Sequence, residues 1–282
     1  MATAKTIQIF LPDGNPVGVK KIEITSRTIK GIYIPRAKFE SADSIPELKK
    51  PGVYFLIGGE DNEECYIGES ENCYDRLKHH NNKKDFWNKA IIFVSKVDDG
   101  FMKSHVKYLE HIMIKMATEC DRYTIVNSNT TKESVIPETI KTDIDDYFND
   151  IRLLLSTLGF SVFEKAVKDS NSTNSSDILY CKCKNALASG EYTEEGLVVL
   201  KGSTITDYIT ESAHDFIKKT RDKLIQKEIL KKEKNDNLYH FTKDYIFSSP
   251  STAAGVIRGS NSNGWIEWKN KDGKKLKEII SK

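Results

Sequence analysis

One stretch constrains the fold of this chain more than any other: GVYFLIGGEDNEECYIGES, which runs from Gly52 to Ser70. It holds two short apolar runs separated by a polar, acidic turn, a pattern typical of a β-hairpin. Tyr54 and Tyr66 would then lie on neighbouring strands, where both can face the same side of a sheet. Tyrosines also pack in strands for purely structural reasons, so at this point the pattern leaves packing and function open.

The composition limits the classes of protein to consider. The chain has 282 residues, of which 30% are charged, and its mean hydropathy is −0.49. It is long enough to bury a core, has no run near the ~20 apolar residues of a membrane helix, and begins without a signal peptide pattern. Five scattered cysteines favour reduced thiols. We expect a soluble, cytoplasmic protein.

Arg76 and His80 follow directly after the second tyrosine run, in a stretch that predicts a helix. Because they are four residues apart, both side chains project from one helix face. Arginine presents a planar fork that matches phosphate oxygens, and histidine can transfer protons near neutral pH. The pair therefore suits an anionic substrate, although the net charge of only +2 requires any nucleic-acid contact to rest on local patches.

Glu110 lies in the stretch KSHVKYLEHIMIKMATEC, whose apolar residues recur at helical spacing. On a helical projection its carboxylate borders the buried stripe formed by Val106, Leu109 and Met113. Burying a carboxylate costs several kcal/mol unless it meets a partner or a metal ion. A structural ion pair, for example with Arg76, and a metal site are the two alternatives.

Taken in order, these residues resemble the motifs of the GIY-YIG nuclease family. GVY (Gly52 to Tyr54) resembles the first tripeptide, with valine in place of isoleucine, and YIG (Tyr66 to Gly68) matches the second. The other motif residues are Arg76, His80, Glu110 and Asn127. The resemblance covers about residues 50 to 130. Glu69 stands where the excision-repair members carry lysine, and Asn129 competes with Asn127 for the last position.

The resemblance implies a role for each motif residue. Glu110 would bind a single Mg²⁺ or Mn²⁺ ion, which takes only one or two carboxylates plus substrate phosphate. Arg76 would grip the scissile phosphate. Tyr54 is the candidate general base, and this role requires its pKa to fall below its ordinary value near 10, with Arg76, His80 and the metal acting in that direction. His80 would accept the proton onward or act as the base itself.

Tyr66 and Asn127 have supporting roles in this interpretation: the tyrosine would orient water or phosphate, and the asparagine would brace the site. Two alternatives stay open. The chain can be a catalytically weak or inactive nucleic-acid-binding module that keeps the motif residues, or a nuclease acting on RNA or branched substrates. The complete set of motifs favours a metal-dependent DNA endonuclease, with DNA as the partner.

The C-terminal part resembles a domain of unknown function that frequently follows GIY-YIG domains, over about residues 178 to 282. Within it, SSPSTAAGVIRG predicts a helix start with Ser249 near the cap. Such a terminus, with Ser251 beside it and Arg258 at the far end, offers a phosphate contact. Trp265 and Trp268 can stack on bases, but tryptophans beside a turn are more often core anchors.

We therefore expect a mixed α/β (α+β) protein. A small three-stranded antiparallel sheet flanked by helices would form the nuclease domain, and a second α+β domain would follow it. The polar run KDSNSTNSSD is the linker candidate. The expected segments are a β extension over 1–49, the GIY-YIG domain over 50–135, a helical connector over 136–171 and the C-terminal domain over 172–282.

Overall fold

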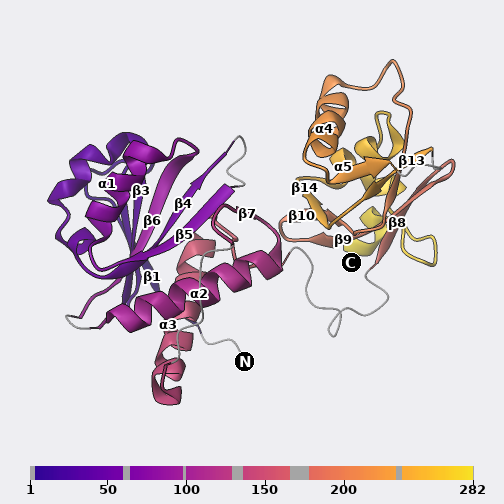
Figure 1. Ribbon diagram of the computed structural model, residues 1–282. Helices are drawn as coiled ribbons and strands as arrows, with labels where there is room; N and C mark the ends of the chain where they lie inside the picture. The colour runs from indigo at the N-terminus through magenta and orange to yellow at the C-terminus, as the bar shows by residue number, and fades with distance from the viewer. Residues whose placement is uncertain are drawn as a thin grey trace. The chain divides into compact units, whose positions relative to one another are not determined.

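The computed structural model describes residues 4–59, 64–97, 100–128, 136–165, 178–232 and 237–281. Contacts divide the chain into two compact units, Met1–Glu164 (unit 1) and Lys165–Lys282 (unit 2) (Figure 1). No helix in the described ranges has the length and apolar character needed to cross a membrane. Each unit has its own hydrophobic core, and the mixed α+β class expected from the sequence is confirmed.

Unit 1 is built on one sheet of seven strands in the order β1-β2-β3-β6-β4-β5-β7. Neighbouring strands are antiparallel except β5 and β7, which are parallel. The strands are β1 (Ile7–Phe10), β2 (Lys20–Ile24), β3 (Ile29–Pro35), β4 (Gly52–Gly58), β5 (Glu64–Ser70), β6 (Trp87–Ser95) and β7 (Thr124–Ile125). The expected three-stranded sheet is its centre, β6-β4-β5. The N-terminal strands widen it because β3 pairs with β6 along its whole length.

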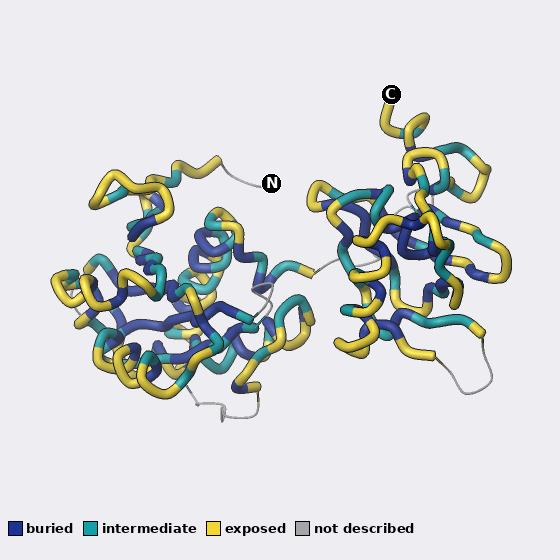
Figure 2. Tube along the Cα trace, turned by 90° about the horizontal axis from the view of Figure 1, so that it is seen from above, coloured by how far each residue is buried: buried dark blue, intermediate teal, exposed yellow. Residues whose placement is uncertain are grey.

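Helices cover both faces of this sheet. They are α1 (Cys73–Lys83), α2 (Lys103–Cys120) and α3 (Glu138–Thr157). The short 3-10 helices η1 (Arg36–Lys38), η2 (Glu40–Ser44) and η3 (Pro46–Lys49) lie in the connection between β3 and β4. Successive strand residues point to opposite faces. Phe55 of β4 packs in the core that α2 and α3 cover, and Tyr54 packs in the core that α1 covers. Buried segments therefore run through the centre of the sheet (Figure 2).

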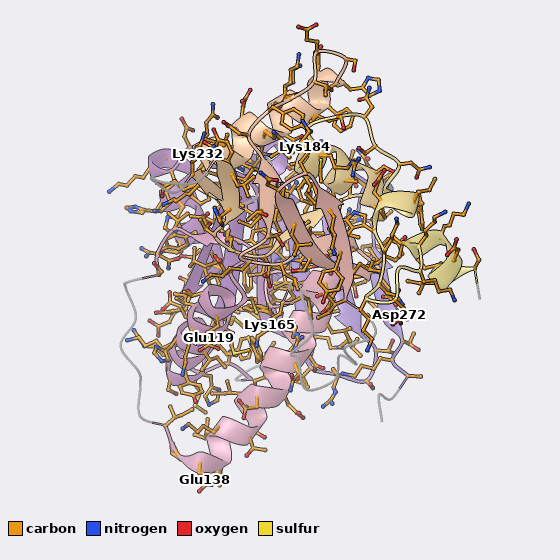
Figure 3. All side chains as sticks on the ribbon, turned by 90° about the vertical axis from the view of Figure 1, so that its right-hand side faces the viewer. Glu119, Glu138, Lys165, Lys184, Lys232 and Asp272 are labelled. Carbon is orange, nitrogen blue, oxygen red and sulfur yellow. The ribbon has the colours of Figure 1, made fainter. Side chains whose placement is uncertain are left out.

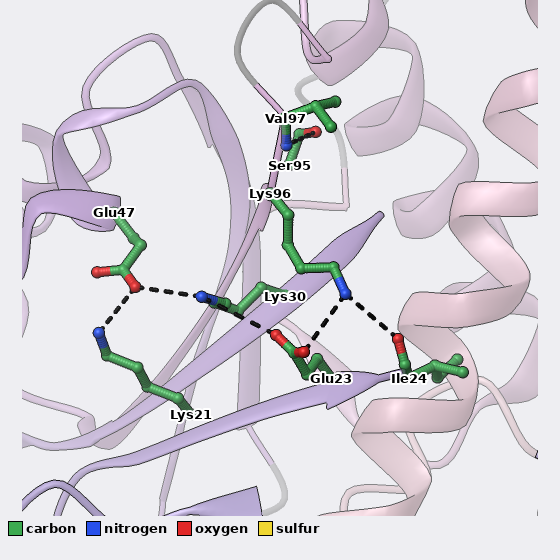
Figure 4. A network of polar contacts seen from close by, with 8 residues as sticks. All are labelled: Lys21, Glu23, Ile24, Lys30, Glu47, Ser95, Lys96 and Val97. Atoms are coloured by element: carbon green, nitrogen blue, oxygen red, sulfur yellow. Dashed lines mark hydrogen bonds and ion pairs between the residues drawn. The ribbon is translucent and has the colours of Figure 1, made fainter. Parts of the chain in front are cut away.

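An ion network connects η3 to the N-terminal strands (Figure 4). The Glu47 carboxylate lies 2.7 Å from the Lys21 ammonium and 3.4 Å from that of Lys30, while Glu23 lies 3.4 Å from Lys96. Burial alone would raise the pKa of Glu47, but the hydrogen bond from Lys21 and the charges of both lysines lower it overall. The side chains of these pairs are about a quarter exposed or less, so solvent screens them less than it screens fully exposed ion pairs.

The helix expected in the connector is α3, and it packs against unit 1. Its buried residues, Ile144, Ile151, Leu154 and Leu155, belong to the same core as the strands. Figure 3 marks Glu138 at its start. The linker candidate KDSNSTNSSD lies outside the described residues. The contact division between Glu164 and Lys165 falls inside the expected connector, and the boundaries of the four expected segments stay predictions.

Unit 2 contains two small sheets, with strand orders β14-β10-β9-β8 and β11-β13-β12. The strands are β8 (Leu179–Cys183), β9 (Ala186–Thr193), β10 (Gly196–Val199), β11 (Thr204–Thr206), β12 (Leu230–Lys232), β13 (Leu238–Phe241) and β14 (Tyr245–Phe247). The helices are α4 (Asp215–Gln226), α5 (Pro250–Arg258), α6 (Gly264–Glu267) and α7 (Leu276–Ile280).

The two tryptophans of unit 2 differ in their surroundings. Trp268 is fully buried, and its indole N–H donates to the Pro250 carbonyl oxygen at 3.2 Å, so it is a core anchor. Trp265 keeps 36% of its surface exposed. Its ring meets that of Tyr192 edge to face, with 5.6 Å between the centroids.

Candidate active site

The two tyrosines share one face of the sheet because of the strand register. Tyr54 on β4 pairs with Gly68 on β5, and Leu56 pairs with Tyr66. Tyr54 and Tyr66 are therefore diagonal neighbours on the same face, and their rings stack with 6.2 Å between centroids and 14° between planes. The Tyr54 ring lies directly on Gly68, where a Cβ atom would collide with the phenol oxygen. The glycine of YIG is thus required by the close approach of the first tyrosine.

The glycine of the first tripeptide has a similar reason. A Cβ at Gly52 would lie 2.5 Å from the Phe93 carbonyl oxygen on β6 and 3.0 Å from the Cys73 sulfur on α1. The carbonyl oxygen belongs to the sheet backbone and cannot move aside without breaking the pairing of β4 with β6. Gly52 therefore lets the start of α1 pack close to the sheet, which brings the next turns of that helix over the tyrosines.

Helix α1 presents Arg76 and His80 to the tyrosines. Asn72 caps the helix by accepting a hydrogen bond from the Asp75 backbone N–H at 3.3 Å. Arg76 Nε donates to the Tyr54 phenol oxygen at 3.3 Å, and the guanidinium also interacts electrostatically with Tyr66. The same phenol oxygen lies 2.9 Å from His80 Nε2. Arg76 and His80, which the four-residue spacing places on one helix face, therefore both contact the phenol oxygen of Tyr54.

The positions of the protons follow from this geometry. A guanidinium can only donate, so the Tyr54 hydroxyl is left to donate to His80 Nε2, and the ring proton of a neutral His80 sits on Nδ1. That nitrogen is buried and has no hydrogen-bond partner within the described part of the chain, so nothing there stabilises an imidazolium. Burial, followed by the charges of Arg76 and Lys84, lowers the pKa of His80 to about 4. His80 is therefore a neutral acceptor at pH 7.

The sequence predicted that the pKa of Tyr54 falls, and this prediction is wrong when only the protein's own groups act on the phenol. Tyr54 is fully buried, and this burial, together with the neighbouring Tyr66, raises its pKa above the ordinary value. The hydrogen bond and charge of Arg76 act in the lowering direction but are outweighed, and Glu110 adds to the rise. Sequence reasoning counted the nearby cations and underestimated the removal of the phenol from water. The phenol is protonated at rest.

Glu110 is half-buried on α2 and has a strongly perturbed carboxyl group. Burial, and next the charge of Glu69, raise its pKa to about 7. A hydrogen bond with the Glu69 backbone and the charges of Arg76 and Lys107 oppose this rise. Among the described residues, no cation lies at ion-pair distance from Glu110. Glu110 therefore does not form the structural ion pair with Arg76 that was one of the two alternatives.

The carboxyl groups of Glu110 and Glu69 fit a divalent cation. The charge of Glu69 raises the energetic cost of ionising Glu110, and a bound cation would remove that cost. The described residues contain no cluster of three or more side chains that could ligate a metal ion. Mg²⁺, however, commonly binds through one or two carboxylates and completes its coordination with water and substrate phosphate.

Asn127 acts on the backbone beside the site. Its side-chain oxygen accepts from the Ile67 N–H at 3.2 Å, and its side-chain nitrogen donates to the Ile67 carbonyl oxygen at 2.6 Å. The buried amide thus satisfies both backbone groups of the residue between Tyr66 and Gly68. This contact holds the strand that carries the second tyrosine. Asn129, its competitor in the sequence, lies outside the described residues.

The residues proposed for nucleic-acid contact in unit 2 have partners within the protein. Ser249 caps α5 by accepting from the Thr252 N–H at 3.1 Å, and Ser251 accepts from the Gly264 N–H at 3.1 Å. Arg258 has two partners, because it donates to the Lys182 carbonyl oxygen at 2.9 Å and pairs with the Glu267 carboxylate at 3.0 Å. A phosphate contact through these three residues stays a prediction.

Sequence reasoning did not assign a role to Lys84, which the structure places at the site. Its ammonium lies 4.6 Å from the centroid of the Tyr66 ring, a cation–π distance. Its charge also contributes to the low pKa of His80. Spacing could have revealed it, because Lys84 follows His80 by four residues as His80 follows Arg76. It adds a second cation to the face that Arg76 already makes basic.

Comparison with known families agrees with this architecture. Residues 50–123 match the GIY-YIG catalytic domain, so this part of unit 1 is a GIY-YIG domain, which is a nuclease-type fold. Residues 179–280 match the domain of unknown function DUF4357, and the chain therefore joins a GIY-YIG domain to a DUF4357 domain. Searches of curated proteins and of solved structures gave no match.

Proposed function

We propose that this chain is a metal-dependent endonuclease that hydrolyses DNA phosphodiester bonds. The observation that carries the proposal is the phenol oxygen of Tyr54, which receives a hydrogen bond from Arg76 and lies 2.9 Å from His80 Nε2. The carboxyl group of Glu110, which has no ion-pair partner among the described residues, interacts electrostatically with the same group of residues. GIY-YIG domains are generally endonucleases, and this arrangement supplies the groups that such a reaction requires.

Arg76 binds the scissile phosphate in this proposal. Only its Nε is used by Tyr54, and the residue as a whole is exposed, so the rest of its fork can reach a substrate. A guanidinium can donate two parallel hydrogen bonds to phosphate oxygens and offset the charge that grows there in the transition state. The half-exposed Tyr66 orients the phosphate or the attacking water beside it.

Tyr54 and His80 accept the proton of the attacking water together. The Tyr54 oxygen takes a proton from water while its own proton passes to His80 Nε2, so the phenol never has to exist as a free phenolate. The raised pKa of Tyr54 is compatible with this relay. The hydroxide formed attacks phosphorus and the bond to the leaving oxygen breaks. A bound phosphodiester anion favours the imidazolium, which strengthens a base whose pKa is about 4 in the protein alone.

Glu110, with Glu69 beside it, would hold the metal ion. When bound, Mg²⁺ or Mn²⁺ would offset negative charge on the phosphoryl and leaving oxygens. Asn127 has a positioning role, because it fixes the Ile67 backbone between Tyr66 and Gly68. A cytoplasmic location stays a prediction from the sequence.

The test is nicking of supercoiled plasmid by the purified full-length protein with Mg²⁺ or Mn²⁺. We expect strand breaks that stop with chelator, a loss of at least about 100-fold in the Glu110→Ala variant, and no loss in Glu119→Ala. Glu119 is a matched control because it is an exposed glutamate on the same helix (Figure 3). Wild-type rates in Glu110→Ala would overturn the assignment.

The same preparation separates the alternative functions. Retention of DNA without strand breaks with any divalent ion would identify a nucleic-acid-binding module instead. Parallel trials on linear, forked and single-stranded DNA and on RNA would define the substrate. Cleavage of RNA or of forked DNA alone would replace the double-stranded DNA assignment.

A further inference from the structure

Lys84 is a cation of the tyrosine site to which the proposed function gives no role. It follows the last residue of α1, and its backbone N–H donates to the His80 carbonyl oxygen at 2.8 Å. Its side chain is partly exposed, and its ammonium lies 4.6 Å from the centroid of the Tyr66 ring. The guanidinium of Arg76 interacts electrostatically with the same tyrosine. Two cations from the two ends of α1 therefore act on Tyr66.

Arg36 fixes the backbone on both sides of Lys84. Its guanidinium donates to the side-chain and backbone oxygens of Asn81 at 3.0 and 3.1 Å, and to the backbone and carboxylate oxygens of Asp85 at 3.1 Å each. It also donates to the Trp87 carbonyl oxygen at 3.2 Å and lies 4.9 Å from the centroid of that ring. Because Lys84 lies between these residues, its backbone position is set before a ligand binds, which lowers the cost of binding.

The charge of Lys84 is not neutralised by a neighbouring carboxylate. The next residue in the sequence, Asp85, pairs with Arg36 at 3.1 Å. Within the described ranges, no carboxylate lies at ion-pair distance from the Lys84 ammonium. Its contact with Tyr66 is a cation–π contact, which occupies the side of the ammonium that faces the ring. An ammonium has three N–H donors, so it can keep this contact and also donate to an acceptor that approaches from solvent.

A nucleic-acid strand brings more than one phosphate to such a site. Each strand of a duplex carries one phosphate per about 3.4 Å of helix axis. When one phosphate is bound at Arg76, a phosphate that flanks it passes along α1 toward Lys84, about two helical turns further on. Lysine binds phosphate as a point charge, without the planar geometry of arginine. This property suits a phosphate that is held in place but does not react.

We propose that Lys84 binds a phosphate that flanks the scissile one on the same strand, and that this second contact sets the register of the strand over Tyr66. The inference rests on the proposed function, because it takes a nucleic-acid strand as the ligand and Arg76 as the residue that binds the scissile phosphate. It adds a requirement for the substrate. The preferred substrate is a strand with a phosphate beside the scissile one, and an isolated phosphodiester lacks this contact.

The test is binding to the full-length protein in chelator, measured by fluorescence anisotropy over a range of KCl concentrations. The probe is whichever of duplex DNA, single-stranded DNA and RNA binds most tightly to wild type. Lys84→Gln should weaken binding about tenfold and reduce the slope of log affinity against log salt by about 1. Lys84→Arg keeps the charge and should stay near wild type. Lys78→Gln removes the same charge from the side of α1 opposite Arg76 and His80, and it should match wild type.

Two further measurements use the native protein and the reaction. Bound nucleic acid should protect Lys84, but not Lys78, from chemical acetylation in wild type. With Mg²⁺, Lys84→Gln should raise the KM of strand cleavage about tenfold while kcat stays within about threefold of wild type, because a contact to a phosphate that does not react contributes equally before and in the transition state.

The outcomes separate this inference from the proposed hydrolysis. Binding that depends on Lys84 without any strand cleavage would keep the phosphate contact and reject hydrolysis. Cleavage with unchanged affinity and salt slope in Lys84→Gln would keep hydrolysis and overturn the role of Lys84. An equal loss in Lys78→Gln, or no binding of any of the three probes by wild type, would also overturn it.

Discussion

Arg76 in unit 1 and Arg258 in unit 2 were both candidates for phosphate contact, and they use their guanidinium groups differently. Arg76 gives its Nε to a phenol oxygen, while the residue is exposed. Arg258 is tied to a backbone carbonyl oxygen and to the Glu267 carboxylate. An arginine that already pairs with a carboxylate and a carbonyl oxygen within the protein must lose those contacts before the same nitrogen binds a ligand. Arg76 in unit 1 is therefore better placed than Arg258 in unit 2 to bind a phosphate group.

The largest expected effect is that of Tyr54→Phe. This change keeps the buried ring and removes the oxygen that Arg76 and His80 share, so plasmid cleavage should fall by about 10²- to 10⁴-fold. Tyr66→Phe, which leaves that oxygen in place, should cost less. The circular dichroism spectrum should be unchanged in both. A Tyr54→Phe protein that cleaves at the wild-type rate would end the proposed proton relay.

An effect on the order of 2 kcal/mol is expected from the buried neutral His80. Its pKa falls from the ordinary 6.5 to about 4 in the folded protein. Below pH 6.5 the unfolded chain therefore binds a proton that the folded protein excludes, and stability present above pH 6.5 is lost progressively toward pH 4.

Urea unfolding at pH 7 and pH 4.5 measures this loss. His80→Gln should show a smaller difference between the two conditions than wild type. His214→Gln, which changes an exposed histidine of unit 2, should match wild type. Equal pH dependence in wild type and His80→Gln would show that His80 titrates normally.

A smaller effect, about 1 kcal/mol or 2–4 °C in Tm, is expected for Glu110→Gln. The pKa of Glu110 is raised to about 7 from 4.5, so ionising this carboxyl group destabilises the folded protein. Below pH 4.5 the group is protonated and the folded protein has its full stability. Part of that stability is lost as the pH rises through 7. In the presence of a chelator, the Tm of the variant should be higher than that of wild type at pH 8, and the two Tm values should be nearly equal at pH 5.

Glu267→Gln provides the contrast from unit 2, because it removes a partner of Arg258. It should give no increase in Tm at pH 8. If Glu110→Gln instead melted lower than wild type at pH 8, the carboxylate would be stabilising the fold, and the metal-binding role would lose its support.

The sequence predicted the parts of this site that depend on local spacing. The shared sheet face of Tyr54 and Tyr66 follows from a hairpin, and the common direction of Arg76 and His80 follows from helical periodicity. The three-stranded centre of the sheet was expected from the resemblance to GIY-YIG domains. The mixed α+β class was predictable because strand and helix patterns alternate along the chain.

Contacts between distant segments were not predictable. The pairing of β3 with β6 joins residues about sixty positions apart, and no local pattern encodes it. The direction of the Tyr54 pKa depends on complete burial, which only the packed structure reveals.

The most direct test compares initial rates of plasmid nicking by wild type, Arg76→Lys and Arg258→Lys, each with Mg²⁺ and with folding checked by circular dichroism. An ammonium lacks the planar fork of arginine. Arg76→Lys should therefore lose at least about 100-fold in rate, while Arg258→Lys should stay within a few-fold of wild type. Equal rates for Arg76→Lys and wild type, or a comparable loss in Arg258→Lys, would contradict the assignment of phosphodiester hydrolysis to the tyrosine site.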